Sequence, residues 1–144
     1  MNKESVKYKP LVYPAKIIIA WGEAIAGNKE IRDWLAKNGY PELYTFVFAL
    51  NLKETARDWL MKNKYPHLMA LIQGVERNEK ALNWLKQNGF ETLSHIALAG
   101  DGDDYSLEWL KANHRDFAHL ALKIKIRKDQ IQLDHDDVHK ISAE

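Results

Sequence analysis

The chain of 144 residues contains no cysteine. Disulfides, thiolate catalysis and thiolate metal sites are therefore excluded, and the composition fits a reducing compartment. The chain also lacks an excess of either charge, because 21 Lys and Arg residues stand against 20 Asp and Glu residues and leave a formal net charge of +1. No global field therefore draws nucleic acid or an anionic membrane to it.

Long apolar runs are missing as well, and no stretch of the sequence is long enough to span a bilayer. The region before residue 26 makes a poor signal peptide, because Pro10, Pro14, Lys16 and Glu23 interrupt what should be a continuous apolar stretch. We therefore expect a cytoplasmic protein. The length favours one domain with a core of its own.

Four tryptophans recur at intervals of 25 residues, each followed directly by leucine and, four residues later, by asparagine. The tryptophans are Trp34, Trp59, Trp84 and Trp109, and the asparagines are Asn38, Asn63, Asn88 and Asn113. A fixed period in this range is the signature of a repeat architecture. Because the same residue occupies the same place in every unit, we interpret the tryptophans as a structural core ladder rather than as aromatic platforms for a ligand.

Each unit predicts a short helix with a defined stop, since its apolar residues recur with helical spacing. In the first unit, Asn38 and Gly39 supply a left-handed cap, and Pro41 opens the next helix, where its missing N–H is tolerated. Lys64 and His114 stand where Gly39 does, so we expect some backbone strain in those two turns.

Apolar segments between these helices predict a second helix in each unit, at 15–26, 43–50, 68–75, 93–99 and 117–126. Alanine or glycine at positions 49, 74 and 99 indicates close helix approach. The sequence thus predicts an all-α fold, a solenoid of about four to five stacked αα-hairpins over residues 14–126. A polar N-terminal cap at 1–13 is expected to be anchored over the first helix pair by Tyr8, Leu11 and Tyr13, and residues 127–144 form a C-terminal cap or tail.

The later units carry a family resemblance. Residues 91–100, Glu-Thr-Leu-Ser-His-Ile-Ala-Leu-Ala-Gly, are followed at 106–113 by Ser-Leu-Glu-Trp-Leu-Lys-Ala-Asn. This pattern resembles a divergent, tryptophan-containing ankyrin repeat, with a period shorter than the 33 residues of ordinary ankyrin repeats. The resemblance implies a stacked helical solenoid that binds other proteins, without catalysis.

Positions that differ between repeats predict a partner-binding groove on the second helix of each pair. The predicted partner-binding residues are Tyr44, Phe48, His67, Met69, Gln73, Ser94 and His95, and Glu42, Thr45 and Thr92 vary in the same way. Aromatic and Met side chains are enriched in protein interfaces. We therefore predict a monomeric, non-enzymatic protein-interaction module that needs no cofactor or metal and binds an unknown protein or peptide.

Two alternatives stay open. A nucleic-acid-binding repeat would use the basic run Lys123-x-Lys125-x-Arg127-Lys128 with Trp21, which lies outside the tryptophan register. A small metal-dependent enzyme would use the acidic cluster 101–104 or the pair His135 and His139.

We favour structural roles for the groups in the second alternative. The acidic cluster lacks the ligand spacing of a calcium loop, and Asp103 or Asp104 suits the N-terminus of the Trp109 helix. The histidine pair lies in a polar tail, which we expect to be solvated and partly frayed. His95 and His119 are expected to be hydrogen-bonded histidines of the core or groove.

Overall fold

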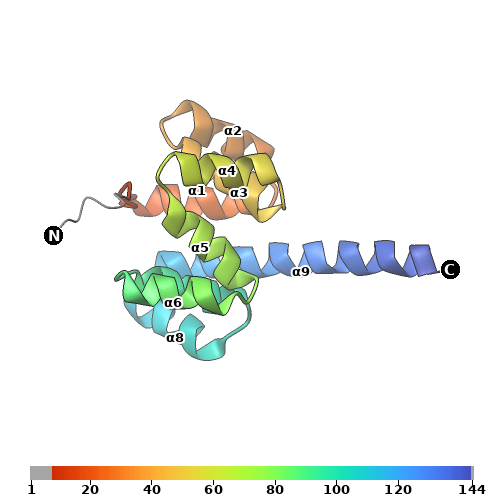
Figure 1. The fold of residues 1–144 in the computed structure, drawn as a ribbon. Helices are drawn as coiled ribbons and strands as arrows, with labels where there is room; N and C mark the ends of the chain where they lie inside the picture. The colour runs from red at the N-terminus through yellow and green to blue at the C-terminus, as the bar shows by residue number, and fades with distance from the viewer. Residues whose placement is uncertain (1–7, 144) are drawn as a thin grey trace.

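The computed structural model describes residues 8–143, with side chains up to residue 136, and within this range it is all-α without strands. The inner helices are α1 (Ala15–Ile25), α3 (Pro41–Leu50), α5 (Pro66–Val75), α7 (Glu91–Gly100) and α9 (Arg115–Ala143). The outer helices are α2 (Lys29–Lys37), α4 (Glu54–Lys62), α6 (Glu79–Gln87) and α8 (Asp104–Asn113). Figure 1 shows the helices in order along the chain, and the all-α prediction is confirmed.

The repeated asparagine explains how each outer helix ends. In all four repeats its side-chain Nδ2 donates to the carbonyl oxygen of the tryptophan four residues earlier, at 2.8 Å. In the first three turns, the backbone N–H two residues after the asparagine donates to the carbonyl of the leucine that follows the tryptophan. These are the bonds of a Schellman cap, so the spacing Trp-Leu-x-x-Asn is a helix-stop signal.

The backbone angle φ agrees with the prediction at Gly39 and Lys64 and differs from it at His114. Gly39 has φ 95° and Lys64 has φ 71°, so the expected strain at Lys64 is present. His114 has φ −152°, and the prediction of strain there is wrong. The reason is that α8 runs on to Asn113 and α9 begins at Arg115, which leaves no room for a left-handed residue.

The buried ladder of the outer helices consists of leucines rather than tryptophans. Leu35, Leu60, Leu85 and Leu110, which follow the tryptophans directly, are each 0% exposed. Trp34 is 45% exposed, so the prediction that it belongs to the core is wrong. Trp59, Trp84 and Trp109 are half-buried and pack against the edge of the core. In each outer helix the leucine, one residue after the tryptophan, faces the core, and the tryptophan lies at the surface or at the edge of the core.

The first and last inner helices, α1 and α9, pack against each other. A Cβ atom on Gly22 would lie 3.3 Å from Cγ of Lys123, and Glu23 Oε2 lies 3.4 Å from Nζ of Lys123 and 3.8 Å from Nε2 of His119. In an open solenoid each repeat contacts only its neighbours in sequence. The predicted solenoid is therefore not confirmed in that form.

The last helix, α9, continues far beyond the predicted segment 117–126. It has 29 residues and extends past the other helices in Figure 1. Lys125 binds Asp129 at 2.7 Å, and Gln130 and Gln132 reach Asp134 and Asp136 at 3.0 and 3.1 Å, all with i,i+4 spacing. The predicted boundary at residue 127 therefore falls inside a continuous helix.

Candidate interaction surfaces

A row of three aromatic rings lies at the start of the inner helices α3, α5 and α7. We call Tyr40, Tyr65 and Phe90, each the last residue before its helix, the aromatic row. His67, on the first turn of α5, stacks between two of them, with ring centroids 6.0 Å from Tyr65 and 5.1 Å from Phe90. Tyr65, His67 and Phe90 thus form one aromatic stack, and Tyr40 holds the equivalent position in the first repeat.

Residues 8–14, which we call the N-terminal segment, lie extended along this row. Tyr13 contacts Tyr40 at 5.9 Å between ring centroids, and the backbone N–H of Lys9 donates to the carbonyl of Lys64 at 3.0 Å. Tyr8 contacts Phe90 at 5.6 Å and Trp84 at 5.5 Å. We expected Tyr8, Leu11 and Tyr13 to be anchors over the first helix pair; the segment instead runs from the third repeat back to the first.

Two buried polar side chains of the inner helices find their partners in this segment. Glu42, 6% exposed, accepts a 2.6 Å hydrogen bond from the Tyr13 hydroxyl. His67, 1% exposed, bonds through Nε2 to the carbonyl of Lys9 at 2.8 Å. Burial, followed by the hydrogen bond to Glu42, raises the pKa of Tyr13 well above its usual value, so its hydroxyl stays a donor. Positions 42 and 67 are equivalent in the repeat, yet Glu42 binds a side-chain hydroxyl of the segment and His67 binds a backbone carbonyl.

The stability of the protein is expected to fall below neutral pH because of His67. Burial lowers its pKa, since Nδ1 is buried without a hydrogen-bond partner, while the bond to Lys9 opposes this only in part. The unfolded state then binds the proton first, so this contribution to stability is complete above about pH 6.5 and is lost as the pH falls through the lower folded-state pKa. Urea unfolding at pH 7.5 and 5.0 measures the loss. The loss should shrink in His67→Gln, and an equal loss in both proteins would contradict the assignment.

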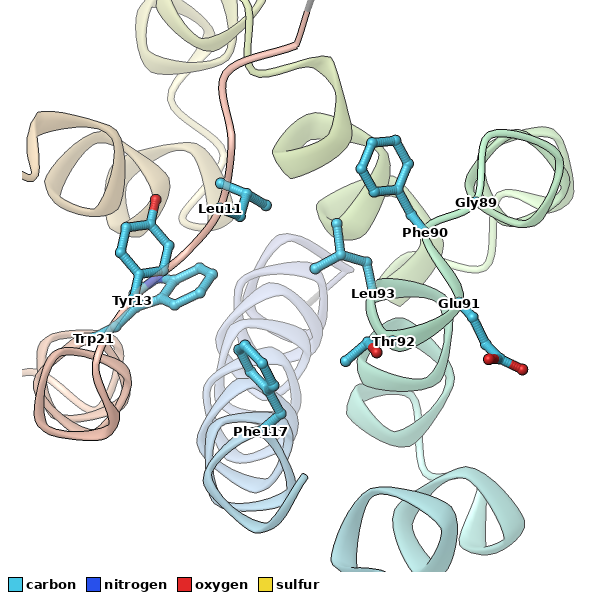
Figure 2. A pocket seen from close by; sticks show the side chains of 9 residues that line it. All are labelled: Leu11, Tyr13, Trp21, Gly89, Phe90, Glu91, Thr92, Leu93 and Phe117. Carbon is cyan, nitrogen blue, oxygen red and sulfur yellow. The ribbon is translucent and has the colours of Figure 1, made fainter. Parts of the chain in front are cut away.

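A cavity of about 420 Å³ lies beside the N-terminal segment. Leu11 from the segment, Trp21 from α1, Leu93 from α7 and Phe117 from α9 point into it from four parts of the chain (Figure 2). Trp21 is 1% exposed, so it is not the surface ring that the nucleic-acid alternative needs. Thr92, equivalent to Glu42 and His67 in the repeat, also lines this cavity.

A second hollow, which we call the α4–α6 groove, lies over α5 between the outer helices α4 and α6. Its volume is about 1290 Å³. Met61, Met69 and Trp84 give it apolar walls, and Tyr8 of the N-terminal segment closes one part. Charged side chains from both outer helices also line it: Glu54, Arg57, Asp58 and Lys80, together with Lys64. Arg57 is held there by Glu76, at 2.8 Å.

The predicted partner-binding residues come from the inner helices α3, α5 and α7. Met69 and Gln73 line the α4–α6 groove, and His67 lies under the N-terminal segment. Tyr44 and Phe48 contact each other and lie 5.8 and 4.9 Å from the Arg32 guanidinium of α2. Arg32 holds the place in its repeat that Arg57, which lines the groove with Met69, holds in the next, and the single groove across all repeats stays a prediction.

Of the two predicted residues of α7, His95 faces the outer helix α8. Ser94 is buried and donates to the carbonyl of Glu91. His95 stacks on Trp109 with ring centroids 4.0 Å apart and bonds to the Ser106 hydroxyl at 3.0 Å. Burial lowers the pKa of His95, which favours the neutral ring in this stack.

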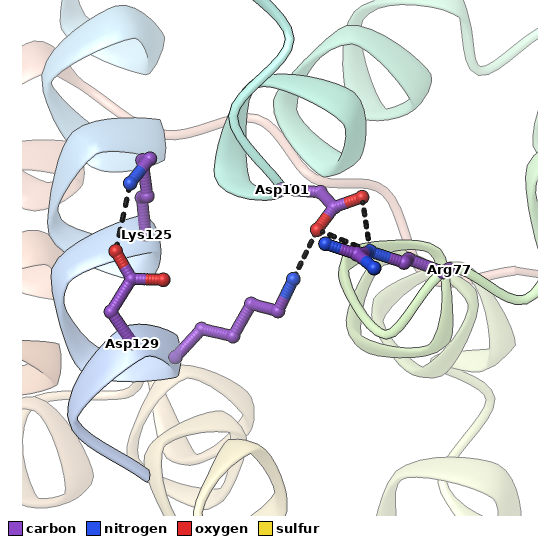
Figure 3. A network of polar contacts seen from close by, with 5 residues as sticks. Arg77, Asp101, Lys125 and Asp129 are labelled. Carbon is purple, nitrogen blue, oxygen red and sulfur yellow. Dashed lines mark hydrogen bonds and ion pairs between the residues drawn. The ribbon is translucent and has the colours of Figure 1, made fainter. Parts of the chain in front are cut away.

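In the basic run of α9, three side chains contact other parts of the protein and Lys125 pairs within the helix. Lys123 pairs with Glu23, Lys125 with Asp129, Arg127 with Asn51 and Lys128 with Asp101. Asp101 is bound by both Arg77 and Lys128, and Figure 3 shows the Arg77 contact beside the pair of Lys125 with Asp129. Burial alone would raise the pKa of Asp101, but hydrogen bonds from Lys128 and Arg77 outweigh it and hold that pKa below its usual value. These contacts tie α9 to α3, α7 and the turn after α5.

The groups named for a metal-dependent enzyme are the acidic cluster 101–104 and the pair His135 and His139. Asp103 accepts from the N–H of Ser106 at 2.9 Å and is the N-cap of α8, as expected. His139 lies outside the residues whose side chains are described, so the pair with His135 is untested. Among the described residues, no three His, Asp or Glu side chains are grouped to hold a metal ion.

Sequence reasoning missed the aromatic row as a surface, although its period of 25 residues was visible at Tyr40, Tyr65 and Phe90.

Comparison of the chain with known protein families, curated proteins and solved structures finds no match. Within residues 8–143 none of the helices has the length and apolar character needed to cross a membrane.

Proposed function

We propose that the chain is a non-enzymatic protein-interaction module that binds an amphipathic helix of a partner protein in the α4–α6 groove. The observation that carries this function is the groove itself. At about 1290 Å³ it exceeds the roughly 300–1000 Å³ of small-molecule pockets. Its walls include Met61, 56% exposed, and methionine adapts its shape to helical ligands.

The charges along the groove define the partner more closely. Glu54 and Asp58 lie on α4, and Lys80 lies on α6. A partner helix with apolar residues at i, i+3 or i+4 and i+7 would place them against Met61, Met69 and Trp84. Basic residues on its α4 side and an acidic residue on its α6 side would complement the edges.

As part of this proposal, the protein is a helical-repeat protein that acts in the cytoplasm. We regard the helix pairs as ankyrin-like units of a short repeat array, adapted by the contact of α1 with α9. The absence of cysteine suits a cytoplasmic place of action. No observation favours the nucleic-acid alternative over this one, since Lys123, Arg127 and Lys128 already contact other side chains.

The groove is tested with a displayed library of amphipathic helical peptides selected against the protein. Peptides that bind the wild type should bind Met61→Glu at least about tenfold more weakly, because the new carboxylate enters the apolar part of the groove. Ile126→Glu is the matched control, since Ile126 is 64% exposed and lies on α9, away from the groove. Both variants should keep their stability to within about 0.5 kcal/mol. Selected peptides that bind Met61→Glu as well as the wild type, or a selection that yields none, would contradict the proposed site.

A further inference from the structure

We propose that the aromatic row is a second binding site, for an extended, tyrosine-containing segment of a partner protein, and that residues 8–14 are its exchangeable intramolecular occupant. The site adjoins the helix-binding α4–α6 groove, which Tyr8 and Lys64 also line. The evidence for it is the set of hydrogen bonds that the N-terminal segment makes there.

The row binds the segment by several kinds of interaction at once. Lys64 supplies a carbonyl to a backbone N–H, and His67 supplies an N–H to a backbone carbonyl of the same residue, Lys9. Contacts of this kind to the main chain recognise an extended segment whatever its side chains. Glu42 adds a side-chain contact, because its buried carboxylate accepts from a tyrosine hydroxyl.

Two buried polar side chains beside the row, Glu42 and His67, have hydrogen-bond partners in the N-terminal segment. Buried carboxylates and imidazoles are unfavourable unless they are hydrogen-bonded. Glu42 and His67 bond across to the N-terminal segment at 2.6 and 2.8 Å. They therefore suit a surface that holds a polar, extended chain, and the equivalent residue of the third repeat, Thr92, lines the neighbouring cavity.

The N-terminal segment itself is held in a way that permits exchange. Val12 is 85% exposed, and Lys9 and Pro10 are exposed as well. One backbone hydrogen bond, from Lys9 to Lys64, joins residues 8–13 to the repeats. Segments with few backbone hydrogen bonds open at a lower free-energy cost than packed helices, but here the contacts of Leu11 and Tyr13 with the core must break as well. A tethered occupant also acts at an effective concentration of roughly millimolar, so it competes with partner segments present below that concentration.

The first experiment measures binding of a fluorescent peptide with the sequence of residues 8–14, Tyr-Lys-Pro-Leu-Val-Tyr-Pro, to the full chain. In the variant Tyr8→Ala/Tyr13→Phe the tethered segment is weakened, and the peptide should bind at least about tenfold more tightly than to the wild type. A control peptide with Phe in place of its second Tyr should bind more weakly, because it cannot donate to Glu42. Glu42→Gln in the protein should reduce that preference.

A second measurement keeps the test decisive if the double variant does not fold. The chain has no cysteine, so a spin label on Val12→Cys reports on the segment alone. Adding the unlabelled peptide should convert the label from a restricted to a mobile signal in proportion to occupancy. A label that stays restricted at millimolar peptide would show that the segment is a fixed part of the fold. A folded double variant that binds no peptide, or binds both peptides equally, would overturn the proposal as well.

Discussion

Replacing Leu85 by alanine is expected to lower the free energy of unfolding by about 2–5 kcal/mol. Leu85 is 0% exposed and belongs to the leucine ladder that the four outer helices turn inward. Truncation there removes buried apolar surface and leaves a cavity that the neighbouring helices fill only in part. Urea unfolding followed by circular dichroism measures the loss.

Trp34→Ala is the matched control for this result. Its side chain is larger than that of Leu85 but 45% exposed, so less apolar surface returns to water than its size suggests. Trp34→Ala should therefore be the milder of the two substitutions. The reverse order would mean that the tryptophans, as the sequence suggested, carry the core.

Replacing Gly74 by alanine is expected to destabilise the protein by about 1–3 kcal/mol, although alanine is the better helix former. A Cβ atom at position 74 would lie 2.8 Å from the Cβ of Ala97 and 3.0 Å from a methyl carbon of Leu82. Because the Ala97 Cβ is fixed to the backbone of α7, the helices α5 and α7 have to move apart.

A double-mutant cycle distinguishes this clash from a local effect on α5. The substitution Ala97→Gly removes the opposing methyl group, so Gly74→Ala should be much less harmful in that background than in the wild type. Thermal or urea unfolding of the four proteins gives the coupling free energy. If the two substitutions are additive, the close approach of α5 and α7 does not limit position 74.

Much of the helical framework was predictable, because the signals that decide it are local. The spacing of tryptophan and asparagine marks the end of each outer helix, and Pro41 and Pro66 mark the start of α3 and α5. Close approach at position 74 was also correctly predicted from its small residue. Periodicity shows that Trp34 and Leu35 occupy fixed places in the unit, but it does not show which of them faces inward.

The length of α9 was missed because polarity was taken as a sign of fraying. No proline or glycine follows Gly102 in the sequence, so nothing stops the last helix. Its i,i+4 pairs, such as Lys125 with Asp129, support the polar part beyond the packed region.

The surfaces could not be predicted, since they depend on how the helix pairs are stacked. Tyr44 lies beside Arg32 of α2, and Met69 lines a groove with the equivalent Arg57 of α4, but the repeat pattern does not show which of these positions is open to a partner. The course of the N-terminal segment depends on contacts between Tyr8 and residues more than 50 positions away, among them Trp84 and Phe90. Neither hydrophobic period nor turn chemistry contains that information.

Site-specific photo-crosslinking in the cells that make the protein tests the interaction function most directly. A benzophenone amino acid at Met61 should give a discrete adduct with one partner protein, and the crosslinked residues of that partner should lie on one face of an amphipathic helix. The same amino acid at Ile126, which is similarly exposed, should not give this adduct. No adduct from position 61, or the same adducts from both positions, would contradict the assignment of the α4–α6 groove as the site of binding.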